Sequence, residues 1–110
     1  MKQRIAGLLG ASSVAAAAYG AHGVPANHPL KTTYDNGNRI HMVHSVALLA
    51  VSGASSPVRL PRTTAALFAL GTAIFSGSCY AAALTGDKTL GRFAPVGGTT
   101  LIVAWMSCCL

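Results

Sequence analysis

The sequence predicts an all-helical membrane protein with four transmembrane helices in an up-down-up-down bundle. Four long apolar stretches contain no Lys, Arg, Asp or Glu. They are residues 5–21, 40–57, 63–86 and 93–110. A membrane-spanning helix needs about 17 to 25 apolar residues, so the first, third and fourth stretches are long enough and the second is marginal. Charged residues make up 9% of the chain, compared with about 25% in soluble domains. The 110 residues therefore form one transmembrane domain, 1–110.

The basic residues do not indicate nucleic-acid binding, although the net charge is +6. The eight Lys and Arg side chains form no stripe and lie beside no aromatic platform. Each flanks a predicted helix, where cations meet lipid headgroups. They are Lys2, Arg4, Lys31, Arg39, Arg59, Arg62, Lys88 and Arg92. The pattern predicts lipids as partners and excludes nucleic acid. Because four of these residues fall on each side of the bundle, the charges do not fix its orientation.

The first two helices are expected over residues 3–21 and 39–55. The basic start and apolar run of the first resemble a secretory signal, but we expect this segment to be retained as a helix. Gly23 and Pro25 follow it and are expected to end the helix. Residues 35–38 (Asp-Asn-Gly-Asn) are typical of a turn, and Asn38 is expected to cap the second helix.

The last two helices are expected over residues 63–84 and 93–110. Thr63 is the expected cap of the third helix, and Gly86 suits the left-handed position at its end. Pro95 falls in the first turn of the fourth helix, where a missing N–H does little harm. Short loops between consecutive helices imply antiparallel neighbours, so both termini are expected on one side of the membrane.

Small residues at four-residue spacing indicate how the helices pack, because close backbone approach drives helix association in lipid. One such stripe lies in the first helix and comprises Ser12, Ala16 and Gly20. A second lies in the third helix and comprises Ala73, Gly77 and Ala81. Beside the second stripe is a polar seam of Thr72, Ser76 and Tyr80, which should face protein.

The histidines and one tyrosine are the candidate ligand-binding residues, because polar or ionisable side chains inside a membrane are functional candidates. The set is His22, His41, His44 and Tyr80. His41 and His44 are three residues apart and are expected to share a helix face. The alternative is structural, with His22 and His44 hydrogen-bonded to loop backbone, Tyr80 or Asp87. No zinc-binding spacing is present, so we expect no metal and no resident cofactor.

No catalytic set is apparent, so the chain is not expected to be an enzyme. Asp35 and Asp87 are the only acidic residues and fall in predicted loops, which excludes paired-carboxylate chemistry. Cys79, Cys108 and Cys109 form no Cys-x-x-Cys motif and are expected to act as small apolar residues.

Several motifs occur in an order that resembles a known family. The segments are Tyr19-Gly20-Ala21-His22-Gly23, His44-Ser45-Val46-Ala47-Leu48-Leu49, Phe75-Ser76-Gly77-Ser78-Cys79-Tyr80, Ala83-Leu84-Thr85-Gly86, Leu90-Gly91 and Ala94-Pro95-Val96-Gly97-Gly98. Over nearly the whole chain they resemble the small four-helix membrane proteins called domain of unknown function 423, the transmembrane protein 256-like proteins. Val43, Ala94 and Val96 depart mildly from the family pattern. The resemblance implies a four-helix fold in a bacterial inner membrane or a mitochondrial membrane, and it implies no known activity.

Two functions are expected from these features. The first is a non-catalytic accessory subunit of a larger membrane assembly, such as a respiratory complex of the mitochondrial inner membrane, with other membrane subunits as partners. The second is a lipid-, quinone- or haem-binding module built on the histidines and Tyr80. A transporter or proton path is not favoured, because no charged residue lies at the predicted midplane and no helix is visibly broken there.

Overall fold

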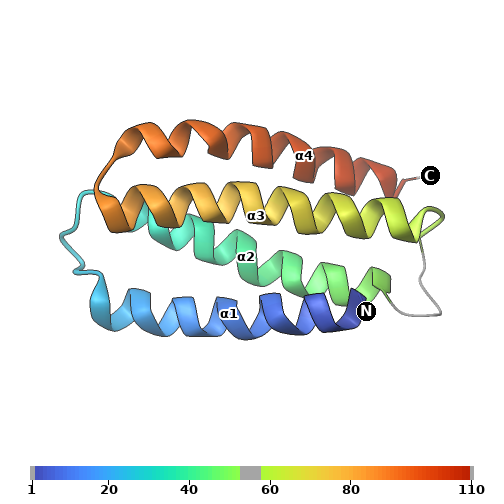
Figure 1. Ribbon diagram of the computed structural model, residues 1–110, viewed down its shortest axis with the longest axis horizontal. Coiled ribbons are helices and arrows are strands. Elements are labelled where there is room, and N and C mark those ends of the chain that lie inside the picture. Colours follow the sequence, from blue (N-terminus) through green and yellow to red (C-terminus); the bar gives the residue numbers. More distant parts are fainter. Residues whose placement is uncertain (1, 53–57, 110) are drawn as a thin grey trace.

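The computed structural model describes residues 2–52 and 58–109 and arranges them as four antiparallel helices (Figure 1). The elements are α1 (Lys2–Gly23), α2 (Lys31–Ser52), α3 (Pro61–Thr85), the 3-10 helix η1 (Lys88–Phe93) and α4 (Ala94–Ser107). Each helix packs mainly against its neighbours in sequence, α1 on α2, α2 on α3, and α3 on α4. The start of α1 and the end of α4 lie at the same end of the long axis, which measures 44 Å (Figure 1). The all-helical class and the antiparallel order predicted from the sequence are confirmed.

Two helices in the described residues are long and apolar enough to cross a membrane, at residues Arg4–Gly23 and Pro61–Thr85. α2 carries charged side chains in its first turns, and its uncharged part, residues 40–52, is about 20 Å long. α4 has 14 residues. Since α2 and α4 both pack along α3, which is long enough to span a membrane, they would lie at the same depth in the bilayer as α3. Crossing by all four helices therefore remains a prediction.

The second helix begins eight residues earlier than expected, at Lys31. The predicted turn at residues 35–38 is wrong, and so is the cap at Asn38, because both lie inside α2. Tertiary contacts outweigh the local turn preference. Gly37 is buried against Cys79, where its carbonyl accepts a 2.7 Å hydrogen bond from the Ser76 hydroxyl. Asn38 uses its side-chain amide to bond both α1 and α3.

The ends of α3 differ from expectation at one end and agree at the other. Pro61 occupies the first turn and Leu60 the cap position, so the cap expected at Thr63 is wrong. A proline needs no N–H partner there and holds the backbone in helical geometry. Gly86 ends the helix with φ 76°, the left-handed position that glycine adopts readily, which confirms the prediction.

The connection from α3 to α4 is ordered by Asp87. Its carboxylate accepts hydrogen bonds from the Thr89 backbone N–H at 2.9 Å and from the Thr89 hydroxyl. These two bonds lower the pKa of the Asp87 carboxyl below its ordinary value, because they stabilise the charged form. η1 then leads into α4, where Pro95 lies in the first turn as predicted. This short 3-10 segment means that α4 begins at Ala94 and ends at Ser107, within the expected range 93–110.

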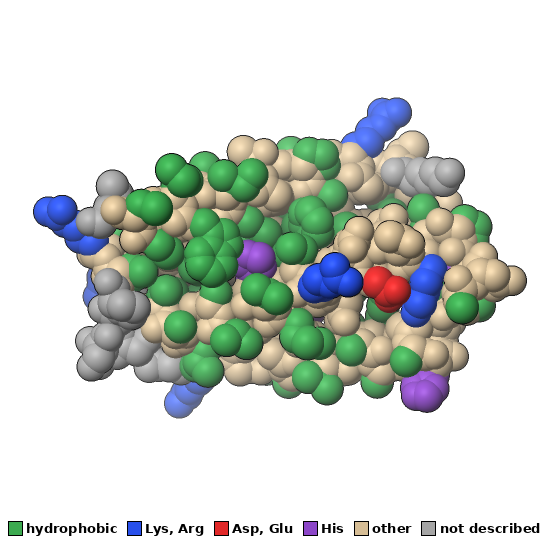
Figure 2. All heavy atoms as spheres, turned by 180° about the vertical axis from the view of Figure 1, so that it is seen from behind, with side chains coloured by type: hydrophobic (Ala, Val, Ile, Leu, Met, Phe, Trp, Pro, Cys, Tyr) green, Lys and Arg blue, Asp and Glu red, His purple; other side chains and the backbone are tan. Residues whose placement is uncertain are grey.

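The main apolar core joins α1, α2, α3 and α4 near the end that holds the termini. Its buried members are Ala6, Leu48, Val51, Ala65, Phe68, Leu101 and Ala104. Hydrophobic side chains are spread along the rear surface, and basic side chains reach out at both ends of the long axis, while two more flank an acidic side chain between the centre and one end (Figure 2). Large apolar residues on the surface include Leu8, Val46 and Ile102, each more than 60% exposed. Such a surface suits a hydrocarbon environment, which the polar headgroups border at both ends.

Candidate functional site

A chain of hydrogen bonds centred on His41 connects three helices in the interior. The Ser12 hydroxyl of α1 donates to the Leu9 carbonyl at 3.0 Å, so its oxygen accepts from His41 Nε2 at 3.1 Å. His41 Nδ1 is then the acceptor for the Tyr80 hydroxyl of α3, 2.9 Å away. This arrangement assigns the neutral imidazole with its proton on Nε2. His41 therefore needs no counter-ion within the bundle.

Tyr80 is the meeting point of this chain. While its hydroxyl donates to His41, its oxygen accepts from the Asn38 side-chain amide at 3.2 Å. The same amide of Asn38 donates to the Ser13 carbonyl at 2.9 Å. The bonds therefore run in one direction, from Asn38 through Tyr80 and His41 to the first helix. Because each donor has an acceptor, this polar chain can be buried in a low-dielectric interior.

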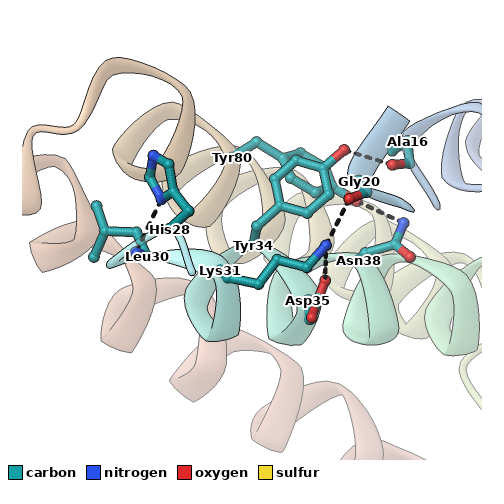
Figure 3. Close-up of polar contacts among 9 residues, drawn as sticks. All are labelled: Ala16, Gly20, His28, Leu30, Lys31, Tyr34, Asp35, Asn38 and Tyr80. Carbon is teal, nitrogen blue, oxygen red and sulfur yellow. Dashed lines mark hydrogen bonds and ion pairs between the residues drawn. The ribbon is translucent and has the colours of Figure 1, made fainter. Parts of the chain in front are cut away.

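A second polar group, at the end of α1, holds the first two helices together (Figure 3). The Tyr34 hydroxyl donates to the Ala16 carbonyl, and Lys31 Nζ donates to the Gly20 carbonyl, both at 2.5 Å. Lys31 also pairs with the Asp35 carboxylate at 3.5 Å. A cation suits this position because the last carbonyls of a helix carry partial negative charge. The Tyr34 ring lies beside Tyr80, with 5.0 Å between ring centroids, and so links this group to the His41 chain.

His44 makes a separate contact on the other flank of α3. Its Nδ1 donates to the Ile40 carbonyl at 2.8 Å, and its Nε2 accepts from the Trp105 indole N–H at 2.9 Å. The Phe68 ring packs against both, with centroids 5.7 Å from His44 and 4.9 Å from Trp105. Both histidines are buried on the side of α2 that meets α3, but they take different partners there. A three-residue step rotates a side chain by about 60° around the helix axis, which here separates the two flanks of α3.

The four candidate ligand-binding residues thus divide into one pair and two single residues. His41 and Tyr80 come together, whereas His44 has both ring nitrogens engaged elsewhere. His22 is exposed near the end of α1, about 15 Å along the helix from Ser12. Haem ligation by His41 or His44 would require breaking one of these hydrogen bonds. Within residues 2–52 and 58–109, no three His, Cys, Asp or Glu side chains are grouped to hold a metal ion.

The two small-residue stripes have different surroundings. Ser12, Ala16 and Gly20 contact α2, where a Cβ at Gly20 would lie 3.1 Å from Cδ1 of the Tyr34 ring. In the stripe of Ala73, Gly77 and Ala81, the first two residues are exposed and the third is half-buried. A Cβ at Gly77 would have no heavy atom within 4 Å. The expected role of this second stripe in packing the bundle itself is not observed, because α4 docks on a neighbouring face of α3 through Gly71 and Gly97.

A small cavity lies between α1 and α3, beside the His41 chain. Its volume is about 200 Å³. The lining residues are Leu9, Ser12, His41, Thr72, Ala73, Ser76, Gly77 and Tyr80. Thr72 is 1% exposed, and its hydroxyl has no hydrogen-bond partner among the residues that the structure describes. The polar seam of Thr72, Ser76 and Tyr80 predicted from the sequence therefore faces protein, and one of its members lacks a partner.

Two contributors were not recognised from the sequence, Asn38 as a side-chain donor and Trp105. For Asn38 a signal exists, because polar residues at 34, 38, 41 and 45 recur every three or four positions and so mark one face of a helix. The turn composition of residues 35–38 obscured it. For Trp105 no local signal exists, because its partner His44 lies 61 residues away in the sequence.

Comparison with known proteins identifies similar membrane proteins in distant organisms. A family described as "Protein of unknown function (DUF423)" matches residues 16–98. A UPF0382 membrane protein of Haemophilus influenzae is 32% identical over 105 residues, which cover 91% of this chain and 83% of the relative. Another from Staphylococcus aureus is 34% identical over 98 residues, covering 86% and 80%. One from Schizosaccharomyces pombe is 33% identical over 111 residues, covering 92% of each chain. No solved structure matches.

Proposed function

Since the chain belongs to the DUF423 family, whose members similar to it are named membrane proteins, we propose that it acts as a non-catalytic accessory subunit of a larger membrane assembly. One observation carries this proposal, a groove of about 450 Å³ along the uncovered face of α3. The second small-residue stripe lies in this groove. Its lining residues are Ala73, Ile74, Gly77, Ser78, Ala81, Leu90, Phe93 and Val96.

The chemistry of the groove fits a transmembrane helix of a partner subunit. From Ala73 to Ala81 the stripe is about 12 Å long, roughly two helical turns. Small residues at this spacing let a second backbone approach closely, and Leu90 and Phe93 provide apolar walls. The Ser78 hydroxyl already donates to the Ile74 carbonyl at 2.5 Å. The groove therefore offers van der Waals contact, which is the main attraction between helices in lipid.

We propose a respiratory complex of the mitochondrial inner membrane as the assembly in a eukaryotic source, and an inner-membrane complex in a bacterial one. Relatives in two bacteria and in a yeast support a membrane location that both kinds of cell share. The absence of catalysis is likewise part of the proposal. Both acidic side chains of the chain are engaged, Asp35 with Lys31 and Asp87 with Thr89.

Affinity purification in a mild detergent tests this proposal. The tagged protein is expected to co-purify with membrane subunits in a fixed stoichiometry, identified by mass spectrometry. Ala81→Leu, which fills the groove, is expected to lose them. Ala50→Leu is the matched control because it adds the same side chain at an exposed position of α2. Purification as a free monomer, or retention of the same subunits by Ala81→Leu, would refute the accessory role.

A further inference from the structure

We propose that the cavity beside His41 binds a neutral, single-ring carbonyl compound with an apolar tail, the chemistry of a membrane quinone. This site adjoins the partner groove and shares Ala73 and Gly77 with it, but it extends toward Ser12 of α1 and His41 of α2 and includes neither Ala81 nor any residue of η1 or α4. The inference does not depend on the accessory role.

The unpaired hydroxyl of Thr72 is the first observation that points to a ligand. Serine and threonine hydroxyls elsewhere in these helices donate to a carbonyl three or four residues earlier. They include Ser13, Ser45, Ser52, Ser78, Thr85, Thr99 and Thr100. Thr72 makes no such bond although it is buried. Hydrocarbon cannot supply the missing partner, so the hydroxyl is available to a hydrogen-bond acceptor that enters the cavity.

The other polar groups of the cavity restrict the ligand to a neutral molecule with an acceptor. The protons of Ser12, Tyr80 and His41 are all directed to acceptors within the protein. The Ser76 hydroxyl donates to the Gly37 carbonyl. None of the described lining residues carries a charge, so an ionic ligand would be desolvated without compensation. A carbonyl oxygen that accepts one bond from Thr72 satisfies this arrangement.

The size and walls of the cavity favour one ring. A protein cavity of about 150 Å³ holds a benzene molecule, so about 200 Å³ holds a six-membered ring with small substituents. The rings of His41 and Tyr80, 5.8 Å apart between centroids, offer aromatic surface to a planar ligand. On the outer side Ala73 and Gly77 are exposed, and a Cβ at Gly77 would have no heavy atom of the described residues within 4 Å. An apolar tail can leave there into the lipid.

Equilibrium binding of a radiolabelled decyl-benzoquinone tests the proposal, using the whole protein in phosphatidylcholine nanodiscs that contain no other quinone. Saturable binding is expected for the wild type. Thr72→Val removes one neutral hydrogen bond and is expected to weaken binding about two- to tenfold. Gly77→Leu fills the opening and is expected to weaken it by more than about 30-fold, by analogy with overpacked sites. Thr99→Val is the control, because Thr99 is exposed and bonds to its own helix.

Several results would overturn the assignment. Circular dichroism first verifies that each variant keeps its helical content, and Thr72→Val is nearly isosteric with the wild type. Wild-type affinity in both Thr72→Val and Gly77→Leu would show that the probe does not occupy this cavity. Equal affinity for decylbenzene would exclude a role for the carbonyl. Failure of the probe to bind, or its displacement by an equal concentration of dioleoylglycerol, would reject a ring carbonyl ligand in favour of lipid.

Discussion

Gly97 is where the contact between α3 and α4 is closest, and replacing it with alanine should separate the two helices. A Cβ at this position would lie 2.8 Å from the Phe75 Cα and 2.9 Å from the Gly71 carbonyl oxygen, and closer still to the Phe75 backbone nitrogen. All three atoms belong to the backbone of α3. No side-chain rotation can therefore make room, and the helix axes must move apart.

The net effect is the difference between overpacking and helix propensity. Inserting a methyl group into a packed site costs about 1–3 kcal/mol, while alanine is better than glycine in a helix interior by about 1 kcal/mol. We therefore expect Gly97→Ala to lower the free energy of unfolding by up to about 2 kcal/mol. Gly98→Ala is the matched control, because its Cβ would meet only the Phe75 ring, at 3.7 Å. This variant should equal the wild type or exceed it by up to about 1 kcal/mol.

Unfolding in detergent micelles by added sodium dodecyl sulfate provides the assay. Far-UV circular dichroism reports helix content, and the fluorescence of Trp105, the single tryptophan, reports the contact of α4 with His44. The unfolding midpoint should fall for Gly97→Ala and not for Gly98→Ala. If Gly97→Ala proves as stable as Gly98→Ala, close backbone contact at this glycine does not hold α4 on α3.

Three further outcomes are expected. Tyr34→Phe removes the hydrogen bond to a carbonyl of α1 and should lower the free energy of unfolding by about 0.5–1.5 kcal/mol, as measured in the same assay; an unchanged midpoint would contradict this. Trp105→Phe removes the hydrogen-bond donor to His44 Nε2 and should lower the free energy of unfolding by about 1–3 kcal/mol. Circular dichroism in the same assay measures this, and a stabilised variant would argue against the bond. For Asp87, NMR should give a carboxyl pKa below the ordinary value of an aspartate, because Thr89 stabilises the charged form. The hydrogen bonds from Thr89 to the charged Asp87 carboxylate should stabilise this loop above the ordinary pKa of an aspartate, and this stabilisation should be lost as the pH falls through the lowered pKa. Thr89→Ala should raise that pKa.

The helix positions could be predicted where hydrophobicity alone decides them. The apolar stretches of α1 and α3 are long enough for a span, and the glycine at residue 86 marks a helix end that needs φ above zero. The start of α2 could not be predicted in this way. Its first turns contain Asp35, Asn36 and Gly37, which favour a turn locally, and only their contacts with other helices make the segment helical.

In the candidate site, too, features set by local helical spacing could be predicted, whereas contacts between residues far apart in the sequence could not. The polar seam on α3 was predicted because the spacing of Thr72, Ser76 and Tyr80 is helical and local. The separation of His41 from His44 depends on where α3 and α4 dock, which three-residue spacing does not specify. That the Thr72 hydroxyl lacks a hydrogen-bond partner could not be predicted from the sequence either, because Thr99, a residue of the same type, bonds to its own helix.

Membrane topology decides whether lipid surrounds all four helices. Single cysteines at the exposed positions Asn27, Arg59 and Thr89, in a background where Cys79, Cys108 and Cys109 are replaced, can be labelled with an impermeant maleimide in sealed vesicles. If every helix crosses, Asn27→Cys and Thr89→Cys react from one side of the membrane, and Arg59→Cys reacts from the other side. Labelling of Asn27→Cys and Arg59→Cys from the same side would show that α2 does not cross, and release of the protein from membranes by alkaline carbonate would show that lipid is not its solvent.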